Sequence, residues 1–286
     1  MQQYIYELTF SCNNVSEETY KLFELGISGI QEISNTLFKV FVTKEDEFEL
    51  LIKNAKKLGF LLVNNKKIKN ENWIIKCPSE LETLEVDNLE IIPTIENENH
   101  ELILAHDLKA DKIKLKIIPG AGFGTGHHET TKNVLKFLQH DEIKNDVSKN
   151  NIKNALDIGT GSAILAIAAN LLYNIPVVAF DNDAMAILNA TENIRLNSCS
   201  DNISLFCGEI SDVNGKFDLI LANIYAEILL DIHENILNSC TKNTFLLLSG
   251  IQEIKSDKII SKYSENFNII AKLSENGWTT ILLKIK

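Results

Sequence analysis

The chain has 286 residues, of which 45% are apolar and 23% charged. It is longer than one typical domain and too apolar to be disordered, so we expect two domains. Its 28 basic and 39 acidic residues give a net charge of −11, and Arg195 is the only arginine, which disfavours a nucleic-acid-binding surface.

The first 72 residues predict a small α+β domain. Residues 2–10 alternate as a strand does, and a helix with Ser16 as its N-cap follows. The predicted elements are a strand at 2–10, a helix at Ser16–Leu25, strands at Gly29–Ile33 and Thr36–Val42, a helix at Lys44–Leu58 and a strand at Phe60–Val63. This β-α-β-β-α-β order is that of a ferredoxin-like sandwich. The polar stretch Asn64–Asn72 has no periodicity, so we place a flexible boundary there and assign domains to 1–72 and 73–286.

The second domain predicts alternating strands and helices. Its short apolar runs before Gly120 do not decide between helix and strand. Further on, we expect strands at Ala155–Ile158, Pro176–Phe180, Ile203–Phe206, Phe217–Ala222, Thr244–Leu248, Phe267–Ala271 and Trp278–Ile285, and helices at Ser162–Leu172, Ala184–Asn197, Ala226–Asn238 and Gln252–Tyr263. Such alternation indicates a parallel, doubly wound sheet whose ligand site lies beyond the carboxyl ends of its strands.

The segment ALDIGTGS predicts a nucleotide-type strand, turn and helix. Asp157, Gly159 and Gly161 form the turn, but Ile164 stands where the dinucleotide fingerprint has its third glycine, which weakens a pyrophosphate interpretation. An acid two positions before the first glycine suits a ligand with a positive group, and S-adenosylmethionine, with its amino-acid end and sulfonium, is such a ligand. The alternative is a purely structural turn in which Asp157 caps the helix.

Two further polar residues end neighbouring strands. Asp181 follows the next strand, 22 residues after Gly159, where a carboxylate can accept both ribose hydroxyls. Nearby Asp183 is placed to cap the following helix instead. Asn223 ends the strand FDLILA and could accept a hydrogen bond from an incoming amine, although a lone asparagine there is more often a turn residue.

A glycine-rich segment, PGAGFGTGHHETT at residues 119–131, precedes these motifs. It lacks the lysine of a P-loop, so we interpret Gly120–Gly126 as a mobile flap that closes over a ligand, with Phe123 as its apolar tip. His127, His128 and Glu129 do not predict a metal site, because adjacent helical positions diverge and no third ligand is visible at a useful spacing.

Together, FGTGHHETT, DIGTGSAILAIAA, the acid of AFDND and ANIYAEIL resemble the PrmA family, the bacterial methyltransferases of ribosomal protein L11. The resemblance covers essentially the whole chain and implies a Rossmann-like class I methyltransferase sheet behind a small substrate-recognition domain, with Trp73 near the junction. It implies that Thr131, Gly159, Asp181 and Asn223 contact S-adenosylmethionine. We add Phe123, Gly124, Thr125, Gly126, Asp157 and Gly161 as candidate cofactor contacts. Two departures are Ala163 in place of the usual glycine, and Ala121-Gly122 within the flap.

The implied chemistry is direct methyl transfer from S-adenosylmethionine to a neutral amine, with Asn223 as the catalytic candidate and Tyr225 as a wall of the amine pocket. The resemblance implies Lys side chains and the N-terminal amine of ribosomal protein L11 as acceptors. Three alternatives stay open. They are a methyltransferase acting on glutamine or a small molecule, although its N-P-P-Y signature is absent at Asn223–Tyr225, a nucleic-acid methyltransferase, and a non-catalytic cofactor-binding module.

The cysteines, the N-terminus and the apolar runs of the sequence indicate where in the cell the protein is located. The five cysteines are odd in number and form no C-x-x-C pair, which fits neither a disulfide framework nor a zinc knuckle. The N-terminus lacks the basic region of a secretion signal, and the apolar run from Ala163 stops at Asn170, short of the ~20 residues that a bilayer requires. We therefore expect a cytoplasmic monomer without membrane or direct nucleic-acid contacts.

Overall fold

The computed structural model describes residues 4–13, 30–42, 45–69, 82–96, 102–104, 111–119 and 126–286. The chain divides into two compact units, Met1–Glu80 and Leu81–Lys286. Each unit is described by itself below.

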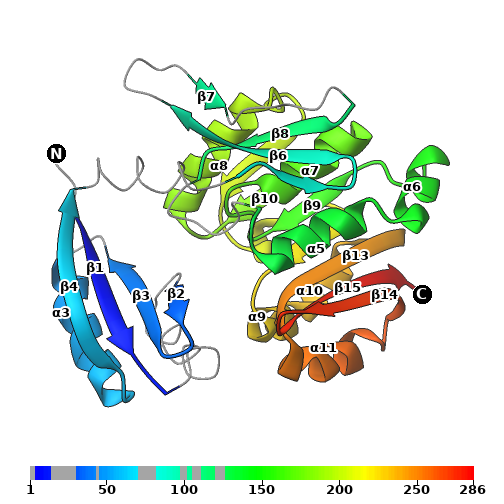
Figure 1. Cartoon of the computed structure of the whole chain (residues 1–286). Helices are drawn as coiled ribbons and strands as arrows, with labels where there is room; N and C mark the ends of the chain where they lie inside the picture. The colour runs from blue at the N-terminus through cyan, green and yellow to red at the C-terminus, as the bar shows by residue number, and fades with distance from the viewer. Residues whose placement is uncertain are drawn as a thin grey trace. The chain divides into compact units, whose positions relative to one another are not determined.

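The N-terminal unit contains a four-stranded antiparallel sheet in the order β2-β3-β1-β4 (Figure 1). Its elements are β1 Tyr4–Ser11, β2 Ile30–Ser34, β3 Leu37–Val42, α3 Glu45–Lys57 and β4 Leu61–Lys69. Alternate residues of β1 and β3, such as Leu8, Phe10 and Phe38, pack against Leu51 and Ala55 of α3. This strand order agrees with the predicted ferredoxin-like sandwich. The predicted helix Ser16–Leu25 lies outside the described residues.

The prediction that Asn64–Asn72 is without structure is wrong for its first six residues. β4 continues to Lys69 and pairs with β1 along its length, from Leu61 opposite Ser11 to Lys69 opposite Tyr4. The side chains of residues 61–67 are exposed, so this strand at the edge of the described sheet has no apolar alternation by which the sequence could reveal it. The strand forms through its backbone hydrogen bonds to β1, which leave no pattern in the sequence.

The C-terminal unit is built on a seven-stranded sheet in the order β11-β10-β9-β12-β13-β15-β14 (Figure 1). The strands are β9 Ala155–Ile158, β10 Val177–Asp181, β11 Ile203–Cys207, β12 Phe217–Asn223, β13 Cys240–Gln252, β14 Phe267–Glu275 and β15 Trp278–Ile285. The first five are parallel, which confirms the predicted Rossmann-like sheet. β15 is antiparallel to both of its neighbours, contrary to an all-parallel prediction, because the tight Asn276-Gly277 turn joins it to β14 as a hairpin.

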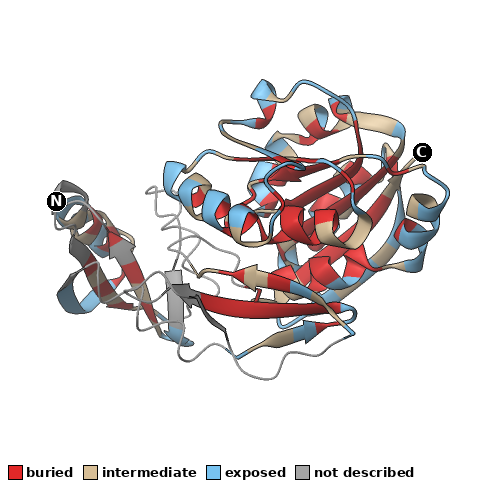
Figure 2. Cartoon of the chain, turned by 90° about the horizontal axis from the view of Figure 1, so that it is seen from above, coloured by how far each residue is buried: buried red, intermediate tan, exposed pale blue. Residues whose placement is uncertain are grey.

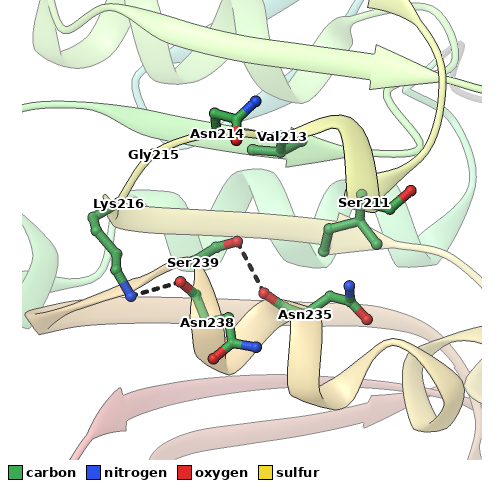
Figure 3. A pocket seen from close by; sticks show the side chains of 9 residues that line it. Ser211, Val213, Asn214, Gly215, Lys216, Asn235, Asn238 and Ser239 are labelled. Carbon is green, nitrogen blue, oxygen red and sulfur yellow. Dashed lines mark hydrogen bonds between the residues drawn. The ribbon is translucent and has the colours of Figure 1, made fainter.

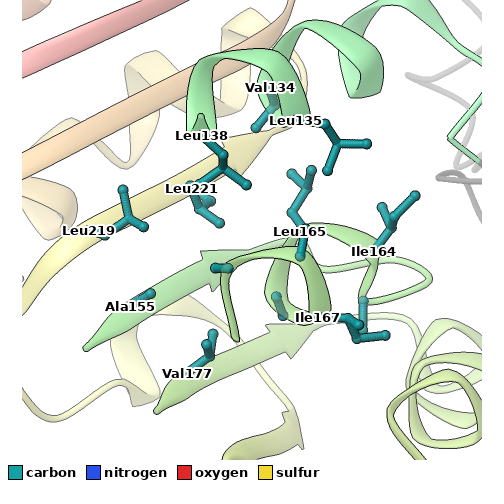
Figure 4. Close-up of a cluster of buried hydrophobic side chains, with 14 of the residues drawn as sticks. Val134, Leu135, Leu138, Ala155, Ile164, Leu165, Ile167, Val177, Leu219 and Leu221 are labelled. Atoms are coloured by element: carbon teal, nitrogen blue, oxygen red, sulfur yellow. The ribbon is translucent and has the colours of Figure 1, made fainter. Parts of the chain in front are cut away.

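Two apolar layers cover the two faces of this sheet, and the central strands are buried (Figure 2). On one face, Val134, Leu135 and Leu138 of α5 (Glu129–Leu138) and Ile164, Leu165 and Ile167 of α7 (Ile164–Tyr173) gather over Ala155, Val177, Leu219 and Leu221 of the strands (Figure 4). On the other face, Leu156 and Ile220 lie under α9 (Ala226–Asp231), α10 (His233–Asn238) and α11 (Ser256–Tyr263). Successive residues of β9 and β12 thus enter opposite cores.

The helices differ from prediction in three places. α7 begins at Ile164 rather than Ser162, because Ala163 adopts a left-handed conformation at φ 64°. The predicted helix Ala226–Asn238 is two helices that meet at Ile232. Near this point the buried Tyr263 hydroxyl donates to the Leu229 carbonyl at 2.7 Å, a carbonyl that in a continuous helix would accept from a backbone N–H. β13 runs to Gln252, and the predicted helix there becomes the 3-10 turn η3 (Glu253–Lys255) followed by α11.

Elements that the sequence did not decide form a smaller sheet and two helices. β6 (Leu89–Glu96) pairs with β5 (Leu84–Val86), β7 (Leu102–Leu104) and β8 (Ile113–Ile117). Besides α5, the segment before β9 contains α6 (Asp141–Ser148).

A ladder of three asparagines joins the smaller sheet to α8 (Ala184–Leu196) and the residue after it. Asn189, Asn193 and Asn197 are spaced four residues apart and therefore share one side of the helix. Asn193 accepts from the N–H of Ile118 at 2.8 Å, and Asn197 accepts from the N–H of Lys116 at 2.9 Å. Their amide groups, with that of Asn189, donate to the carbonyls of the same two residues. The asparagine ladder thus satisfies the edge of β8 as a strand would.

Candidate functional site

Of the predicted site residues, Gly159, Asp181 and Asn223 lie where three neighbouring strands of the large sheet end. In the parallel register, Ile158 stands beside Phe180 of β10 and Ala222 of β12. The residues that follow on these adjacent strands are Gly159, Asp181 and Asn223, so their carboxyl ends meet as predicted.

The turn after β9 is held by Asp181. Gly159 and Gly161 have φ values of 65° and 56°, which glycine adopts without steric cost. The N–H of Gly161 donates to Asp181 Oδ2 at 2.9 Å, and the N–H of Asp183 donates to Oδ1 at 3.0 Å. Each half-buried carboxylate oxygen keeps a further lone pair for a ligand. Asp183 caps α8 by accepting from the N–H of Met185 at 2.8 Å, as predicted.

Asp157 is fully buried beneath the turn. Its Oδ2 accepts from the Thr160 hydroxyl at 2.6 Å and from the N–H of Ala166 in α7 at 3.1 Å, so the structural role as a helix cap is present. Its Oδ1 is buried and has no hydrogen-bond partner among the described groups. Burial, with a smaller contribution from the nearby Asp181, raises the pKa of this carboxyl to about 7 against the opposing effect of those two hydrogen bonds. The site thus contains a costly buried acid that a cationic donor would stabilise.

Asn223 presents a second buried acceptor. Its amide Nδ2 donates to the hydroxyl of the buried Thr131 at 3.3 Å, while its Oδ1 has no partner among the described groups. The structure therefore brings Thr131 of α5 to Asn223 of β12, two candidates that are 92 positions apart. With Nδ2 directed to Thr131, Oδ1 is the amide atom that is left to accept a hydrogen bond from a ligand.

Two glycines fix the backbone after Asn223. A Cβ on Gly159 would lie 2.6 Å from Ile224 Cγ2, and a Cβ on Gly250 would lie 2.5 Å from the Ile224 carbonyl oxygen. Gly250 also has a φ of 76°. The loop that follows β12 is thus clamped between the turn after β9 and the end of β13.

The first turn of α5 packs beside these strand ends, and it is held there by Ser249, a residue that the sequence did not single out. Ser249, near the end of β13 and beside Asn223 of β12, donates from its hydroxyl to the Thr130 carbonyl at 3.2 Å, and its hydroxyl oxygen lies 2.7 Å from the Thr280 hydroxyl. Serine followed by glycine at the end of the apolar strand FLLL is the signal that could have identified it.

Tyr225, the predicted pocket wall, is 37% exposed, and burial of its ring raises the pKa of its hydroxyl to about 12.

Of the predicted flap, only Gly126 belongs to the described residues, whereas Phe123, Gly124 and Thr125 lie outside them. Gly126 has a φ of 91°, and a Cβ there would lie 3.1 Å from Ile91 Cγ2. His128 caps α5 through Nδ1, and burial lowers its pKa. His127 Nε2 lies 2.9 Å from the Glu82 carbonyl oxygen. Among the residues that the structure describes, no group of three or more His, Cys, Asp or Glu could hold a metal ion.

A hollow of about 350 Å³ lies at the other end of the sheet (Figure 3). Its lining residues precede β12 and β13, and they include Ser211, Asn214, Lys216, Asn235 and Asn238. Lys216 Nζ donates to the Asn238 carbonyl at 2.6 Å, and the Ser239 hydroxyl donates to the Asn235 carbonyl at 2.9 Å. This hollow opens at the amino ends of the strands, away from every candidate residue, so we assign it no ligand.

Known proteins that are similar to this chain share one description. The family model described as ribosomal protein L11 methyltransferase (PrmA) matches residues 8–286. A ribosomal protein L11 methyltransferase of Campylobacter jejuni (strain 81-176) is 34% identical over 301 aligned positions, which cover 99% of this chain and 98% of that protein. One from Thermotoga maritima is 35% identical over 225 positions, covering 78% and 77%. The crystal structure of a ribosomal protein L11 methylase from Lactobacillus delbrueckii subsp. bulgaricus matches with a TM-score of 0.58 at 30% identity, covering 72% of this chain and all of that one.

Proposed function

The chain belongs to the ribosomal protein L11 methyltransferase (PrmA) family, and on that premise we propose that it transfers methyl groups from S-adenosylmethionine to Lys side chains and the N-terminal amine of ribosomal protein L11. The family and the fold make the chain a protein methyltransferase and imply the use of this cofactor. The observation that carries the proposal is a pair of buried oxygens, Asp157 Oδ1 and Asn223 Oδ1, near neighbouring strand ends of the large sheet, neither of which has a hydrogen-bond partner among the residues that the structure describes.

The residues present fit S-adenosylmethionine. Asp157 Oδ1 suits a cationic donor, and the lone pairs of Asp181 that remain suit two ribose hydroxyls. In the turn, residues 159 and 161 are glycines, and the Thr160 hydroxyl between them is directed to Asp157. When bound, the cofactor supplies an electrophilic methyl group on a sulfonium.

The chain's own residues prepare the acceptor amine. A Lys side chain has an ordinary pKa of about 10.4 and an N-terminal amine one of about 7.8, and only the neutral amine has a lone pair with which to attack. Asn223 Oδ1 can accept a hydrogen from the neutral amine and so direct its lone pair, while Thr131 keeps that oxygen in place. Asn223 is uncharged, so it does not favour the protonated amine as a carboxylate would. Positioning of this kind supplies most of the expected rate enhancement.

The test uses labelled S-adenosylmethionine and a mixture of ribosomal proteins. We expect label in L11 with the wild-type chain, and at least about a hundredfold slower transfer with Asn223→Ala, because orientation of the amine is lost. The matched control is Asn214→Ala, at the hollow on the opposite edge, which should transfer at the wild-type rate. Label in another protein, or in none, would contradict the proposal.

Cofactor binding is tested separately with Asp181→Ala. Loss of the carboxylate should weaken S-adenosylmethionine binding by roughly 1.5 to 3 kcal/mol, the range for hydrogen bonds to a charged group. Calorimetric titration measures this directly. An unchanged affinity would remove Asp181 from the cofactor site.

The remaining expectations are part of the same proposal. Residues 1–72 would recognise the protein substrate, and the chain would act as a monomer in the cytoplasm. Among the described residues, the structure contains no helix long and apolar enough to cross a membrane. A role as a regulatory, non-catalytic binding module is less favoured, since it does not require the acceptor at Asn223.

A further inference from the structure

The turn after β9 ends in a strained residue. Ala163 is fully buried and has φ 64° and ψ 15°, which is the left-handed conformation. A Cβ makes this conformation unfavourable, so a residue other than glycine keeps it only where the surrounding structure holds it there. Contacts of the neighbouring backbone must therefore hold Ala163 in this conformation.

The peptide group between Ser162 and Ala163 is the part of the turn whose rotation would release the strain. If this group turned over, φ of Ala163 would become negative while the chain on either side kept its course. Two hydrogen bonds oppose the rotation. The N–H of Ala163 donates to the Thr160 carbonyl at 2.9 Å, and the Ser162 carbonyl accepts from Asn193 Nδ2 at 3.0 Å, from 31 positions away. The second bond comes from outside the turn, from the helix α8.

The amide of Asn193 is oriented for this bond. Asn193 is fully buried, and its Oδ1 accepts from the N–H of Ile118 at 2.8 Å, which directs Nδ2 to the Ser162 carbonyl. An ionised aspartate at this position would set a carboxylate oxygen against that carbonyl, and an alanine would leave the carbonyl without its donor. Asparagine therefore suits both contacts, whereas aspartate and alanine do not.

The turn that Asn193 holds is the one that contains proposed cofactor contacts. Gly161 is one of them, and its N–H donates to Asp181, another of them, at 2.9 Å. That bond fixes the first half of the turn, whereas Asn193 fixes the second half, directly before α7. Rotation of the strained peptide group would also break the bond between the Ala163 N–H and the Thr160 carbonyl. It would therefore move the backbone beside Gly161.

We propose that Asn193 is a positioning residue for the cofactor, which keeps the turn after β9 in the conformation that binds S-adenosylmethionine by holding the peptide group between Ser162 and Ala163. Asn193 is fully buried, so it acts through the turn. This inference rests on the proposed function and adds to it a residue that prepares the cofactor site. Without the Asn193 bond, only a fraction of the molecules would have the binding conformation, and the apparent Kd would rise by the inverse of that fraction.

The experiment compares Asn193→Ala with Asn197→Ala in the full chain. Asn197 is the matched control because it belongs to the same asparagine ladder, but its side chain bonds Lys116 and the Asn193 carbonyl, which lie outside the turn. Calorimetry measures the Kd for S-adenosylmethionine at a temperature where both variants are folded. We expect Kd to rise about tenfold in Asn193→Ala, since left-handed alanine is disfavoured by about that factor, and to stay within twofold of wild type in Asn197→Ala. Tm should fall in both variants, and kcat for L11 at saturating cofactor should be unchanged in both.

A rescue variant removes the strain itself. Glycine has no Cβ and adopts the left-handed conformation freely. Adding Ala163→Gly to Asn193→Ala should therefore recover most of the lost affinity for S-adenosylmethionine, while Tm stays below that of the wild-type chain. A merely structural role of Asn193 would not produce this recovery of affinity.

Amide exchange without ligand measures the state of the turn directly. The Ala163 N–H should exchange faster in Asn193→Ala than in the control, because its bond to the Thr160 carbonyl is broken when the peptide group has turned over. If Asn193→Ala does not fold, Asn193→Asp takes its place in every measurement. The aspartate keeps an acceptor for the N–H of Ile118 and, when ionised, has no donor for the Ser162 carbonyl.

A Kd for S-adenosylmethionine in Asn193→Ala within twofold of wild type overturns the inference. An equal rise in Asn197→Ala also overturns it, because the ladder would then act on the fold in general. So does a rise in Kd that Ala163→Gly does not reduce, since strain at Ala163 would then have no part in the effect. Wild-type chain that binds S-adenosylmethionine without methylating L11 overturns the proposed function alone, and wild-type chain that does not bind the cofactor overturns both.

Discussion

The buried carboxyl of Asp157 makes the site sensitive to pH near neutrality. Burial raises its pKa from 3.8 to about 7, so without ligand the side chain is about half protonated at pH 7. Since the folded pKa lies above the unfolded one, its contribution to stability is complete below about pH 4 and is lost as the pH rises to about 7. A cationic ligand group near Oδ1 favours the ionised form and lowers the pKa again.

We therefore predict that S-adenosylmethionine binding releases up to about half a proton at pH 7. Calorimetry in two buffers of different ionisation enthalpy measures this quantity. Asp157→Asn should bind without proton release, and its unfolding free energy should no longer decline between pH 4 and 7. Equal proton release by both proteins would show that another group titrates.

Gly250 determines where the backbone after Asn223 lies. Gly250→Ala combines left-handed strain, about 1–2 kcal/mol, with a clash of Cβ against the backbone of Ile224. Gly277→Ala is the matched control, because its φ of 79° is almost the same and nothing lies within 4 Å of its Cβ. We expect Gly250→Ala to lose at least about 1 kcal/mol more unfolding free energy than the control, and to lose methyl transfer, which the control keeps. Urea unfolding and the transfer rate measure the two effects; equal losses would mean that the close contact with Ile224 is unimportant.

At the scale of elements, the asparagine ladder connects α8 to β8, and the loss of unfolding free energy on removing it can be predicted. Asn193 is fully buried and donates to the Ser162 carbonyl at 3.0 Å as well as bonding to Ile118, so it ties the turn after β9 to the end of β8. Asn193→Ala removes the hydrogen-bond acceptor of the Ile118 N–H and the Asn193 donor to the Ser162 carbonyl. It should therefore reduce the unfolding free energy by at least about 2 kcal/mol. The exposed neighbour on α8, Glu192→Ala, should change it by less than about 0.5 kcal/mol. If the Ile118 amide exchanges equally slowly in both variants, the ladder does not protect this edge.

Sequence patterns predicted elements where burial gives the apolar residues a regular spacing, and where a polar residue follows an apolar run. Asp181 and Asn223 stand out because each follows a buried strand, and the fold then aligns their strand ends. The extension of β4 to Lys69 gave no such signal, because exposed Asn and Lys side chains surround a backbone that is ordered by its partner strand. The break at Ile232 depends on Tyr263, which lies 31 positions later, and the Ser249–Thr130 bond depends on packing of α5 against β13. Contacts between distant segments set these features, and local periodicity does not encode them.

At the scale of the whole molecule, the two units have separate apolar cores, so we expect recognition and transfer to be separable. A chain that starts at Trp73 should keep its affinity for S-adenosylmethionine within a few fold of wild type, since the candidate cofactor residues follow that point. It should lose most transfer to L11, because a separate recognition unit raises the effective concentration of the target amine. Calorimetry and labelled transfer measure the two properties; a truncated chain that methylates L11 at the full rate would assign the N-terminal unit to another role.

The asparagine ladder also has a consequence for how copies of the molecule behave toward each other. An open strand edge presents N–H and C=O groups that can recruit a strand of another chain and begin aggregation. At Lys116 and Ile118 these groups are already bonded to side chains of Asn193 and Asn197, so a foreign strand would have to displace them. α8 thus protects β8 against intermolecular strand pairing, and variants that lose the ladder should aggregate at temperatures where the wild-type chain stays dispersed.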